Sequence, residues 1–347
     1  MIVQNSKRHN SKTAEVALRE VCRTLHLSIH TENSYAGWLM RFSAFAKDHV
    51  EVAREEKVRW FLSDLAPRVS VSTHRQALCA IVFFYKRVLN EPLGIIGEIA
   101  PASVPKRLPD CMTDSEVRAV LGKLRGEFHD MAALAYGAGL RLRELVSLRV
   151  KDLDFERGTI IVRQGKGAKD RATFLPRSCA DELRAQLRES RLVWERDRQR
   201  GLPGVFLPDS LESKMPNAGS EWAWQWVWPS RELSTDPRTG IRRRHHIHET
   251  AFQKAVKAAG MAAGLSRRVH PHLFRHSFAT ACLTQGMAIH ELKELLGHVS
   301  IETTEQYLHV LGPALGRTQS PLDAQPSNVV RFADQSSHNP VLRIAEA

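Results

Sequence analysis

The first part of the chain carries a series of short amphipathic helical patterns. Between residues 12 and 95, apolar side chains recur at three- and four-residue steps, the spacing that gives a helix one apolar face. Three such sets are Tyr35, Trp38, Leu39, Phe42 and Phe45; then Val58, Phe61, Leu62 and Leu65; then Leu78, Ile81, Val82, Tyr85, Val88 and Leu89. Short helices bury these faces against one another. The pattern predicts a compact helical domain over residues 12–95.

Residues 96–112 break this pattern. Pro101, Pro105 and Pro109 fall within a short stretch that also contains Lys106 and Arg107. Prolines at this density interrupt helices and favour extended backbone. The segment is therefore predicted to be a basic linker between two domains.

A second domain is predicted over residues 113–312. It opens with Thr113 and Glu116 at the spacing of a capping box, followed by helical periodicity to about Leu148. Two strands are expected next, at 158–163 and 171–175, because a turn-rich segment separates them.

The remaining patterns are helical at 178–200, irregular at 203–247, helical again at 249–311, and polar and disordered at 313–347. The fold class predicted for the whole chain is mainly α. A helical domain would precede a mixed α+β domain with a small antiparallel sheet.

Charge and cysteine content limit the class of protein. The 347 residues hold 50 Lys and Arg against 38 Asp and Glu, a net charge of +12, which favours a nucleic acid as partner over an anionic membrane. The five cysteines are scattered without a C-x-x-C pair, so neither a disulfide framework nor a zinc site is expected. No signal-like segment or membrane-length apolar run is present, which predicts a soluble cytoplasmic protein.

The C-terminal half contains the groups that metal-free phosphoryl transfer requires. This chemistry needs a nucleophile, cations for the non-bridging oxygens, and an acid for the leaving oxygen. The candidates are Arg141, Lys166, His272, Arg275, His298 and Tyr307.

Each candidate also has a simpler interpretation when it is taken alone. Arg141 could simply form a surface ion pair with Glu144 on one helix. Lys166 could be a solvated turn residue, and Tyr307 could be a half-buried aromatic residue. His272 and His276 lie four residues apart, but no Glu or Cys completes a metal-ligand set. We favour the catalytic interpretation because all these residues occur together.

The motifs GLR…EL…L…D, GKG…K…R, HxxRHSFAT, LLGH and a final tyrosine occur in that order between Gly139 and Tyr307, within a resemblance that covers roughly residues 12–312. In this the chain resembles the tyrosine recombinases, or phage-type integrases. The resemblance implies that Arg141 and Arg275 clamp the scissile phosphate and that Lys166 protonates the leaving 5′ oxygen. It further implies that His272 and His298 assist proton transfer, and that Tyr307 forms a 3′-phosphotyrosine. A phenol with a pKa near 10 needs such cations to attack at neutral pH.

The resemblance also implies how the domains act. The first would be a SAM-like core-binding domain, and Lys106 and Arg107 of the linker would contact the DNA backbone. Four copies would assemble on DNA, the helix after Tyr307 docking into a neighbour through Leu308, Val310 and Leu311. No cofactor, metal or small-molecule substrate is implied.

Residues 203–247 interrupt the catalytic domain and hold four of the seven tryptophans, at Trp222, Trp224, Trp226 and Trp228. This insertion resembles the additional segment of integron integrases, which recombine gene-cassette sites folded from single strands. By position, the residues that match contacts to flipped-out bases are Trp224, Pro237, His245 and His246.

The composition of the insertion independently suits DNA. Aromatic faces stack on bases at about 1–3 kcal/mol each, and Arg242, Arg243 and Arg244 would attract phosphates. Two or three of its tryptophans are expected to be core, with Trp224 the exposed one. His245 and His248 as a metal pair are disfavoured.

The sequence therefore predicts a site-specific DNA recombinase that integrates and excises integron gene cassettes. It would join folded single-stranded cassette sites to a duplex attachment site. The alternatives are a Xer- or phage-type recombinase on duplex sites, a non-catalytic DNA-binding protein, and a type IB topoisomerase, which shares the chemistry.

Overall fold

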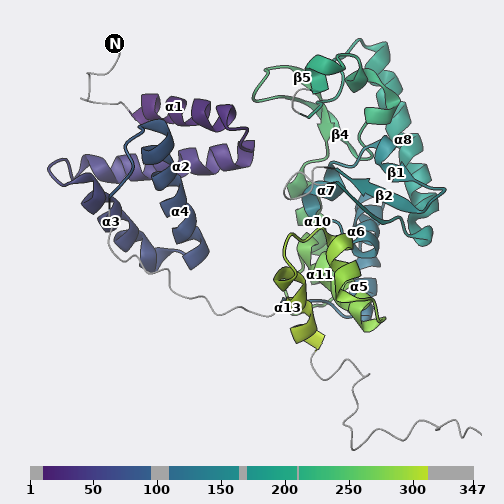
Figure 1. Cartoon of the computed structure of the whole chain (residues 1–347). Coiled ribbons are helices and arrows are strands. Elements are labelled where there is room, and N and C mark those ends of the chain that lie inside the picture. Colours follow the sequence, from purple (N-terminus) through teal and green to yellow (C-terminus); the bar gives the residue numbers. More distant parts are fainter. Residues whose placement is uncertain (1–10, 95–108, 164–169, 209–210, 312–347) are drawn as a thin grey trace, which may run out of the picture. The chain divides into compact units, whose positions relative to one another are not determined.

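The computed structural model describes residues 11–94, 109–163, 170–208 and 211–311. The chain divides between Lys106 and Arg107 into two compact units, shown in Figure 1. The first unit is helical. The second combines helices with a three-stranded and a two-stranded antiparallel sheet among its described residues. The predicted fold class, mainly helical with small antiparallel sheets, is confirmed.

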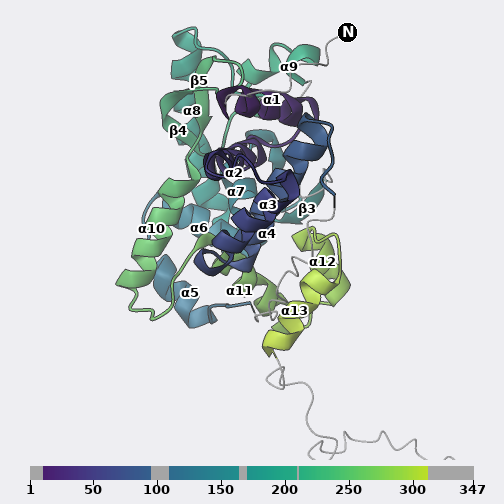
Figure 2. The same cartoon turned by 90° about the vertical axis from the view of Figure 1, so that its left-hand side faces the viewer.

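The first unit contains the helices α1 (Ser11–Thr24), α2 (Ile29–Lys47), α3 (Arg54–Leu65) and α4 (Val71–Phe83), with a 3-10 turn at Ala66–Arg68 and a π-helix at Phe84–Val88 that prolongs α4. Its core is built from the predicted apolar faces, with Trp38, Phe42, Phe61 and Ile81 buried together. Figure 2 shows these helices from a second direction.

The second unit opens with α5 (Asp114–Leu121), α6 (Glu127–Ala138) and α7 (Leu142–Val146). The capping box predicted for α5 is present. The Glu116 amide donates to Thr113 Oγ1 (3.2 Å), and the Thr113 amide donates to Glu116 Oε2 (2.8 Å). This double cap fixes where the helical part of the unit starts.

A three-stranded sheet follows, formed by β1 (Leu153–Asp154), β2 (Thr159–Val162) and β3 (Arg171–Phe174) in that order. The two predicted strands pair antiparallel, with Val162 opposite Arg171. Residues 164–169, and with them Lys166, lie outside the described residues. After a 3-10 turn at Arg177–Cys179 comes α8 (Ala180–Gln199), the predicted charged helix.

The expectation that 203–247 is irregular throughout was wrong. The segment holds α9 (Leu211–Lys214), 3-10 turns at Ala218–Ser220 and Trp222–Trp224, and a hairpin of β4 (Pro229–Thr235) and β5 (Arg242–His246). The strand β5 carries no apolar alternation, because its buried positions are arginines whose charges are neutralised by carboxylates. Hydrophobic periodicity could not detect such a strand.

The helices α10 (Glu249–Ala262), α11 (Pro271–Thr284), α12 (Ile289–Leu296) and α13 (Glu302–Leu311) complete the unit. The main core includes Met131, Leu134, Phe252 and Phe274. A smaller cluster joins Phe278 and Leu283 of α11 to Tyr307 of α13. This packing seats the tyrosine helix against α11.

Two further expectations fall on parts of the chain that are not described: the linker residues Lys106 and Arg107, and the tail 313–347. In the described ranges, no helix is both long and apolar enough to cross a membrane.

Candidate active site

A pocket of about 510 Å³ in the second unit brings together five of the six residues predicted to be catalytic. Its lining includes Arg141, His272, Arg275, His298 and Tyr307. These residues come from separate elements, namely the start of α7, the helix α11, the end of α12 and the helix α13. The sixth, Lys166, lies outside the described residues.

Two glycines in left-handed conformation shape the pocket. Gly139 ends α6 with φ 62° just before Arg141, and Gly297 ends α12 with φ 61° just before His298. A Cβ on Gly139 would lie 2.4 Å from the Phe278 ring, and one on Gly297 would lie 2.8 Å from Cδ of Arg171. Only glycine combines this backbone with such close packing.

Arg275 is 3% exposed and is held by backbone acceptors. Its guanidinium donates to the carbonyls of Gly139 and Leu296, both at 2.6 Å, and to Nε2 of His298 at 3.1 Å. Burial, together with the charge of Arg141, lowers the pKa of Arg275 to about 9, so it stays cationic at neutral pH. The side chain is a preorganised positive charge.

Glu144 is the counter-charge of this cluster. Its oxygens accept from Arg141 Nη1 (2.7 Å), from the Arg141 amide (2.8 Å), and from both terminal nitrogens of Arg171 (2.7 and 2.8 Å). Arg275 lies 3.9 Å away. Burial alone would raise the pKa of Glu144, but the Arg171 and Arg141 bonds lower it to about 2. The Arg141–Glu144 pair expected from the simpler interpretation thus forms, and Arg141 also lines the pocket.

His298 is hydrogen-bonded through both ring nitrogens. An arginine can only donate, so Nε2 of His298 must accept from Arg275, and Nδ1 then donates to Thr304 Oγ1 at 2.9 Å. Burial and the charges of Arg275 and Arg141 lower the pKa of His298 to about 3. The ring is therefore neutral at pH 7, in the Nδ1–H tautomer.

Tyr307 is 1% exposed and its hydroxyl lies 2.8 Å from Nδ1 of His276. Burial raises the pKa of Tyr307, while the charges of Arg275 and Arg141 oppose that rise. Sequence reasoning treated His276 only as a member of an unlikely metal pair, so this contact was missed. Its position inside the HxxRH motif was the available signal.

His272 lies in the first turn of α11 with its side chain exposed at the pocket. Burial of the ring, with His270 and Arg275 nearby, lowers its pKa. His272 and His276 do not form a metal cluster. No group of three or more His, Cys, Asp and Glu in the described part of the chain could hold a metal ion.

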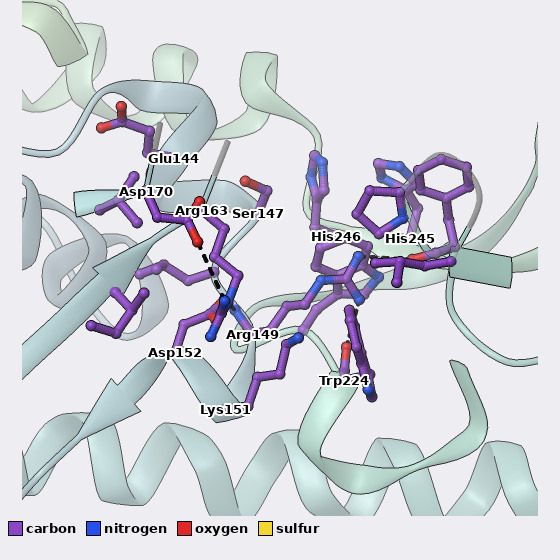
Figure 3. A pocket seen from close by; sticks show the side chains of 17 residues that line it. Glu144, Ser147, Arg149, Lys151, Asp152, Arg163, Asp170, Trp224, His245 and His246 are labelled. Carbon is purple, nitrogen blue, oxygen red and sulfur yellow. Dashed lines mark hydrogen bonds and ion pairs between the residues drawn. The ribbon is translucent and has the colours of Figure 1, made fainter. Parts of the chain in front are cut away.

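A second pocket, of about 600 Å³, lies beside the insertion (Figure 3). Its lining includes Trp224 and Trp226 of the insertion, His245 and His246 of β5, and Arg149, Lys151 and Asp152 from the turn before β1. Figure 3 shows the Lys151 side chain reaching toward Trp224. His245 and His246 lie above Trp224 in this view.

Cations and aromatic rings alternate in this second pocket. Nζ of Lys151 lies 3.0 Å from the centroid of the Trp224 ring, and the Arg149 guanidinium lies 3.8 Å from that of Trp226. Burial and Arg163 lower the pKa of Lys151 to about 8, and burial lowers that of His246 to about 3. Sequence reasoning missed Arg149 and Lys151, which no motif marks.

Two of the four tryptophans of the insertion belong to the core, as expected. Trp226 and Trp228 are buried, whereas Trp222 and Trp224 are partly exposed. Pro237 is exposed in the turn between β4 and β5 and does not line the second pocket.

The three arginines of β5 differ sharply. Arg242 is exposed, but Arg243 is 3% exposed and bound to Glu212 (2.7 Å) and Asp236 (2.8 Å). Arg244 is 9% exposed and bound to Asp197 at 2.6 Å. Arg243 and Arg244 were expected to attract phosphates. They are instead buried in ion pairs that hold the hairpin in place.

Comparisons with known proteins agree with this arrangement. Residues 112–312 match the model of the phage integrase family, and residues 16–95 match its N-terminal SAM-like domain. An integrase/recombinase of Escherichia coli is 48% identical over 312 residues, covering 89% of this chain and 93% of that protein. The tyrosine recombinase XerA of Thermococcus onnurineus is 30% identical, covering 87% of this chain and 95% of that protein.

The fold also resembles that of XerH bound to palindromic difH DNA, with a TM-score of 0.56 and 21% identity over 89% of this chain and 83% of that one. The helical unit and the arginine–histidine–tyrosine pocket are those of an enzyme class that cuts and rejoins DNA. The chain belongs to the phage integrase family of tyrosine recombinases. It therefore acts on DNA, and its reaction is site-specific recombination.

Proposed function

We propose that Tyr307 is the nucleophile of this recombinase and forms a 3′-phosphotyrosine with the cleaved strand. The observation that carries the proposal is the shared pocket of Tyr307, Arg141 and Arg275. Two guanidinium groups beside one phenol suit a phosphodiester, because they stabilise the charge that develops on its non-bridging oxygens. Religation draws on the retained ester bond and consumes no ATP.

The other predicted residues take roles that fit their surroundings. His272, exposed at the pocket, would donate to a phosphate oxygen. His298, whose two ring nitrogens are bonded to Arg275 and Thr304, would position the Arg275 guanidinium. Lys166 would protonate the leaving 5′ oxygen. Arg141 and Arg275 need no reorganisation to bind phosphate, since Glu144 and backbone carbonyls already orient them.

We further propose that the chain recombines integron gene cassettes whose sites are folded single strands. The second pocket supports this, because its aromatic rings and cations suit an extrahelical base and its phosphate. Trp224 would stack on the base after Lys151 moves aside, and His245 and His246 would contact its edge. Exposed Arg242 and the linker residues Lys106 and Arg107 would contact phosphates, and exposed Pro237 would contact a flipped-out base.

Four copies would assemble on two sites, with the helix that follows Tyr307 contacting a neighbour. Leu308 is 38% exposed and available for that contact. The side chains of Val310 and Leu311 lie outside the described residues.

The competing function is recombination of duplex sites, favoured by the likeness to XerA. To separate the two, the chain would first select its own site from a randomised pool of single strands that fold into hairpins. Binding of that hairpin and of the matching duplex is then compared. Cassette recombination predicts preference for one folded strand, and equal affinity would contradict it.

The nucleophile is tested on the selected site with a nick beside the scissile phosphate, which traps the covalent product. Wild-type protein should give a protein–DNA band on a denaturing gel. Tyr307→Phe should bind normally and give none. A surviving band would refute the role of Tyr307, and no band with wild-type protein would support a non-catalytic DNA-binding protein.

A further inference from the structure

The hydroxyl of Tyr307 has one close polar neighbour on another helix. Nδ1 of His276 in α11 lies 2.8 Å from the Tyr307 oxygen in α13, within ordinary hydrogen-bonding distance. The two rings are tilted, with centroids 5.7 Å apart. Both helices are packed through the cluster that contains Phe278 and Leu283, so the contact is supported by the core.

Arg141, Arg275 and His298 also line the pocket, but they are poorly suited to receive the phenolic proton. His272 is exposed at the pocket, and the hydrogen bond of the Tyr307 hydroxyl is to His276. Arg141 and Arg275 are donors only. His298 uses Nε2 to accept from Arg275 and Nδ1 to donate to Thr304. The tyrosine must nevertheless lose its proton when its oxygen bonds to phosphorus, since a phosphotyrosine ester carries none.

We propose that His276 accepts the proton of Tyr307 as the phenol oxygen attacks the scissile phosphorus. This inference rests on the proposed nucleophilic role of Tyr307. It assigns His276 a function in the cleavage step that is separate from clamping the phosphate or protonating the leaving group.

In the proposed cleavage step, one proton moves from Tyr307 to His276 and another reaches the leaving oxygen. The Tyr307 oxygen forms a bond to phosphorus while its O–H electrons remain on oxygen, and the proton moves to Nδ1 of His276. The bond from phosphorus to the 5′ oxygen breaks, and that oxygen takes a proton from the general acid assigned to Lys166. Religation runs the same transfers in reverse, with protonated His276 returning its proton to the tyrosine oxygen.

Before the attack, the His276 ring is neutral and can therefore accept a proton. Burial, with His272, His270 and Arg275 nearby and Asp110 opposing them, lowers the pKa of His276 to about 4. The ring is thus neutral at pH 7, and Nδ1 can accept. A bound DNA phosphate adds negative charge beside the ring, which raises this pKa and strengthens the base at the moment of attack.

Two substitutions separate proton acceptance from positioning. His276→Asn keeps an acceptor near the place of Nδ1 but cannot take up the proton, whereas His276→Ala removes both. Single-turnover cleavage is measured with the full chain on the self-selected nicked hairpin. We expect both variants to cleave about 100-fold more slowly with unchanged DNA affinity. His276→Asn, which keeps a partner for the buried hydroxyl, should also keep the wild-type melting temperature. His290→Ala, an exposed histidine on α12, is the matched control and should cleave at the wild-type rate.

A substrate with sulfur in place of the 5′ bridging oxygen makes the test specific to the nucleophile. A thiolate leaves without being protonated, so this substrate should restore cleavage to Lys166→Ala but not to the His276 variants. Rescue of the His276 variants would place His276 on the leaving group and overturn the proposal.

Two other results would also overturn it. Cleavage by His276→Asn near the wild-type rate would reduce His276 to a positioning residue, and faster cleavage by His276→Ala would make the contact an inhibitory latch. Absence of any adduct with wild-type protein would instead mean that the proposed function has failed.

Discussion

At the scale of single residues, Glu144 shows how the arginines at the pocket are stabilised. Its pKa in the folded protein is about 2, well below the ordinary value for a glutamate, because Arg171 and Arg141 bind the charged form and outweigh the effect of burial. A carboxylate with a lowered pKa stabilises the fold fully above its unfolded pKa, and that contribution is lost as the pH falls through the folded value.

We therefore expect Glu144→Gln to lower the free energy of unfolding by about 3 kcal/mol at pH 7. The difference from wild type should shrink as the pH falls from 4 toward 2, as measured by urea unfolding at each pH. Glu195→Gln, which breaks a half-exposed pair with Arg191 on α8, should cost under about 0.5 kcal/mol. A difference independent of pH would show that Glu144 acts through packing alone.

Thr304 and Arg275 together fix the tautomer of His298. The Thr304 side chain is fully buried and accepts the Nδ1–H of that ring. Thr304→Val keeps the shape but leaves Nδ1–H without an acceptor, which costs about 1–3 kcal/mol. We expect cleavage to fall about tenfold as the ring loses its orientation, while nitrogen NMR reports a mixture of tautomers.

The control is Thr284→Val, an exposed position on α11 that should change neither the cleavage rate nor the NMR signals. An unchanged tautomer in Thr304→Val would show that Arg275 alone fixes the ring.

The sequence identifies the residues that line the pocket better than those that support them. Arg141, His272, Arg275, His298 and Tyr307 stand in ordered motifs, and the structure places them around one pocket. Motif order cannot reveal the contact of His276 with Tyr307, since the two residues lie 31 positions apart. Nor does any motif mark Arg149 and Lys151, whose role follows from the rings beside them.

At the scale of elements, β5 depends on ion pairs where strands ordinarily depend on apolar packing. Arg244 reaches Asp197 on α8 and ties the hairpin to that helix, with both side chains almost buried. Breaking one partner of such a pair leaves an uncompensated buried charge. The neighbouring Arg242 is exposed and is not part of a buried ion pair.

The contrast between buried, paired Arg244 and exposed Arg242 gives a prediction for two substitutions. Asp197→Asn should lower the free energy of unfolding by about 3 kcal/mol. Arg242→Ala should leave stability unchanged, weaken DNA binding, and reduce the slope of log Kd against log salt by about one. Chemical unfolding and fluorescence anisotropy measure these effects. The assignment fails if Arg242→Ala leaves the slope unchanged or if Asp197→Asn is as stable as wild type.

The same strand explains why the helices and the first sheet could be predicted but the hairpin could not. Apolar periodicity marks the buried face of α2 through Trp38 and Phe42, and alternation marks β2 through Ile160 and Val162. In β5 the two buried positions are Arg243 and Arg244. Their partners are Asp236 in the turn before β5, Glu212 in α9 and Asp197 in α8, so only the folded structure shows that their charges are neutralised.

At the scale of the whole molecule, affinity and site preference should have different origins. Both units carry a surplus of basic residues, and the whole chain has a net charge of +12. Phosphate contacts release counterions, so DNA affinity should fall about a thousandfold between 50 and 200 mM salt if six or more phosphates are bound. This loss applies to the folded strand and to duplex alike.

Preference for a folded strand should instead come from stacking in the second pocket, which releases few ions. The ratio of hairpin to duplex affinity should therefore stay constant across the same salt range, because the electrostatic contributions cancel in the ratio. Trp224→Ala should reduce that ratio by about 5- to 100-fold, the loss of one stacked base at 1–3 kcal/mol, without changing the salt slope. Trp60→Ala, a partly exposed tryptophan of the first unit, is the control. A preference that disappears with salt would assign strand choice to charge and leave the aromatic rings of the insertion without a role in it.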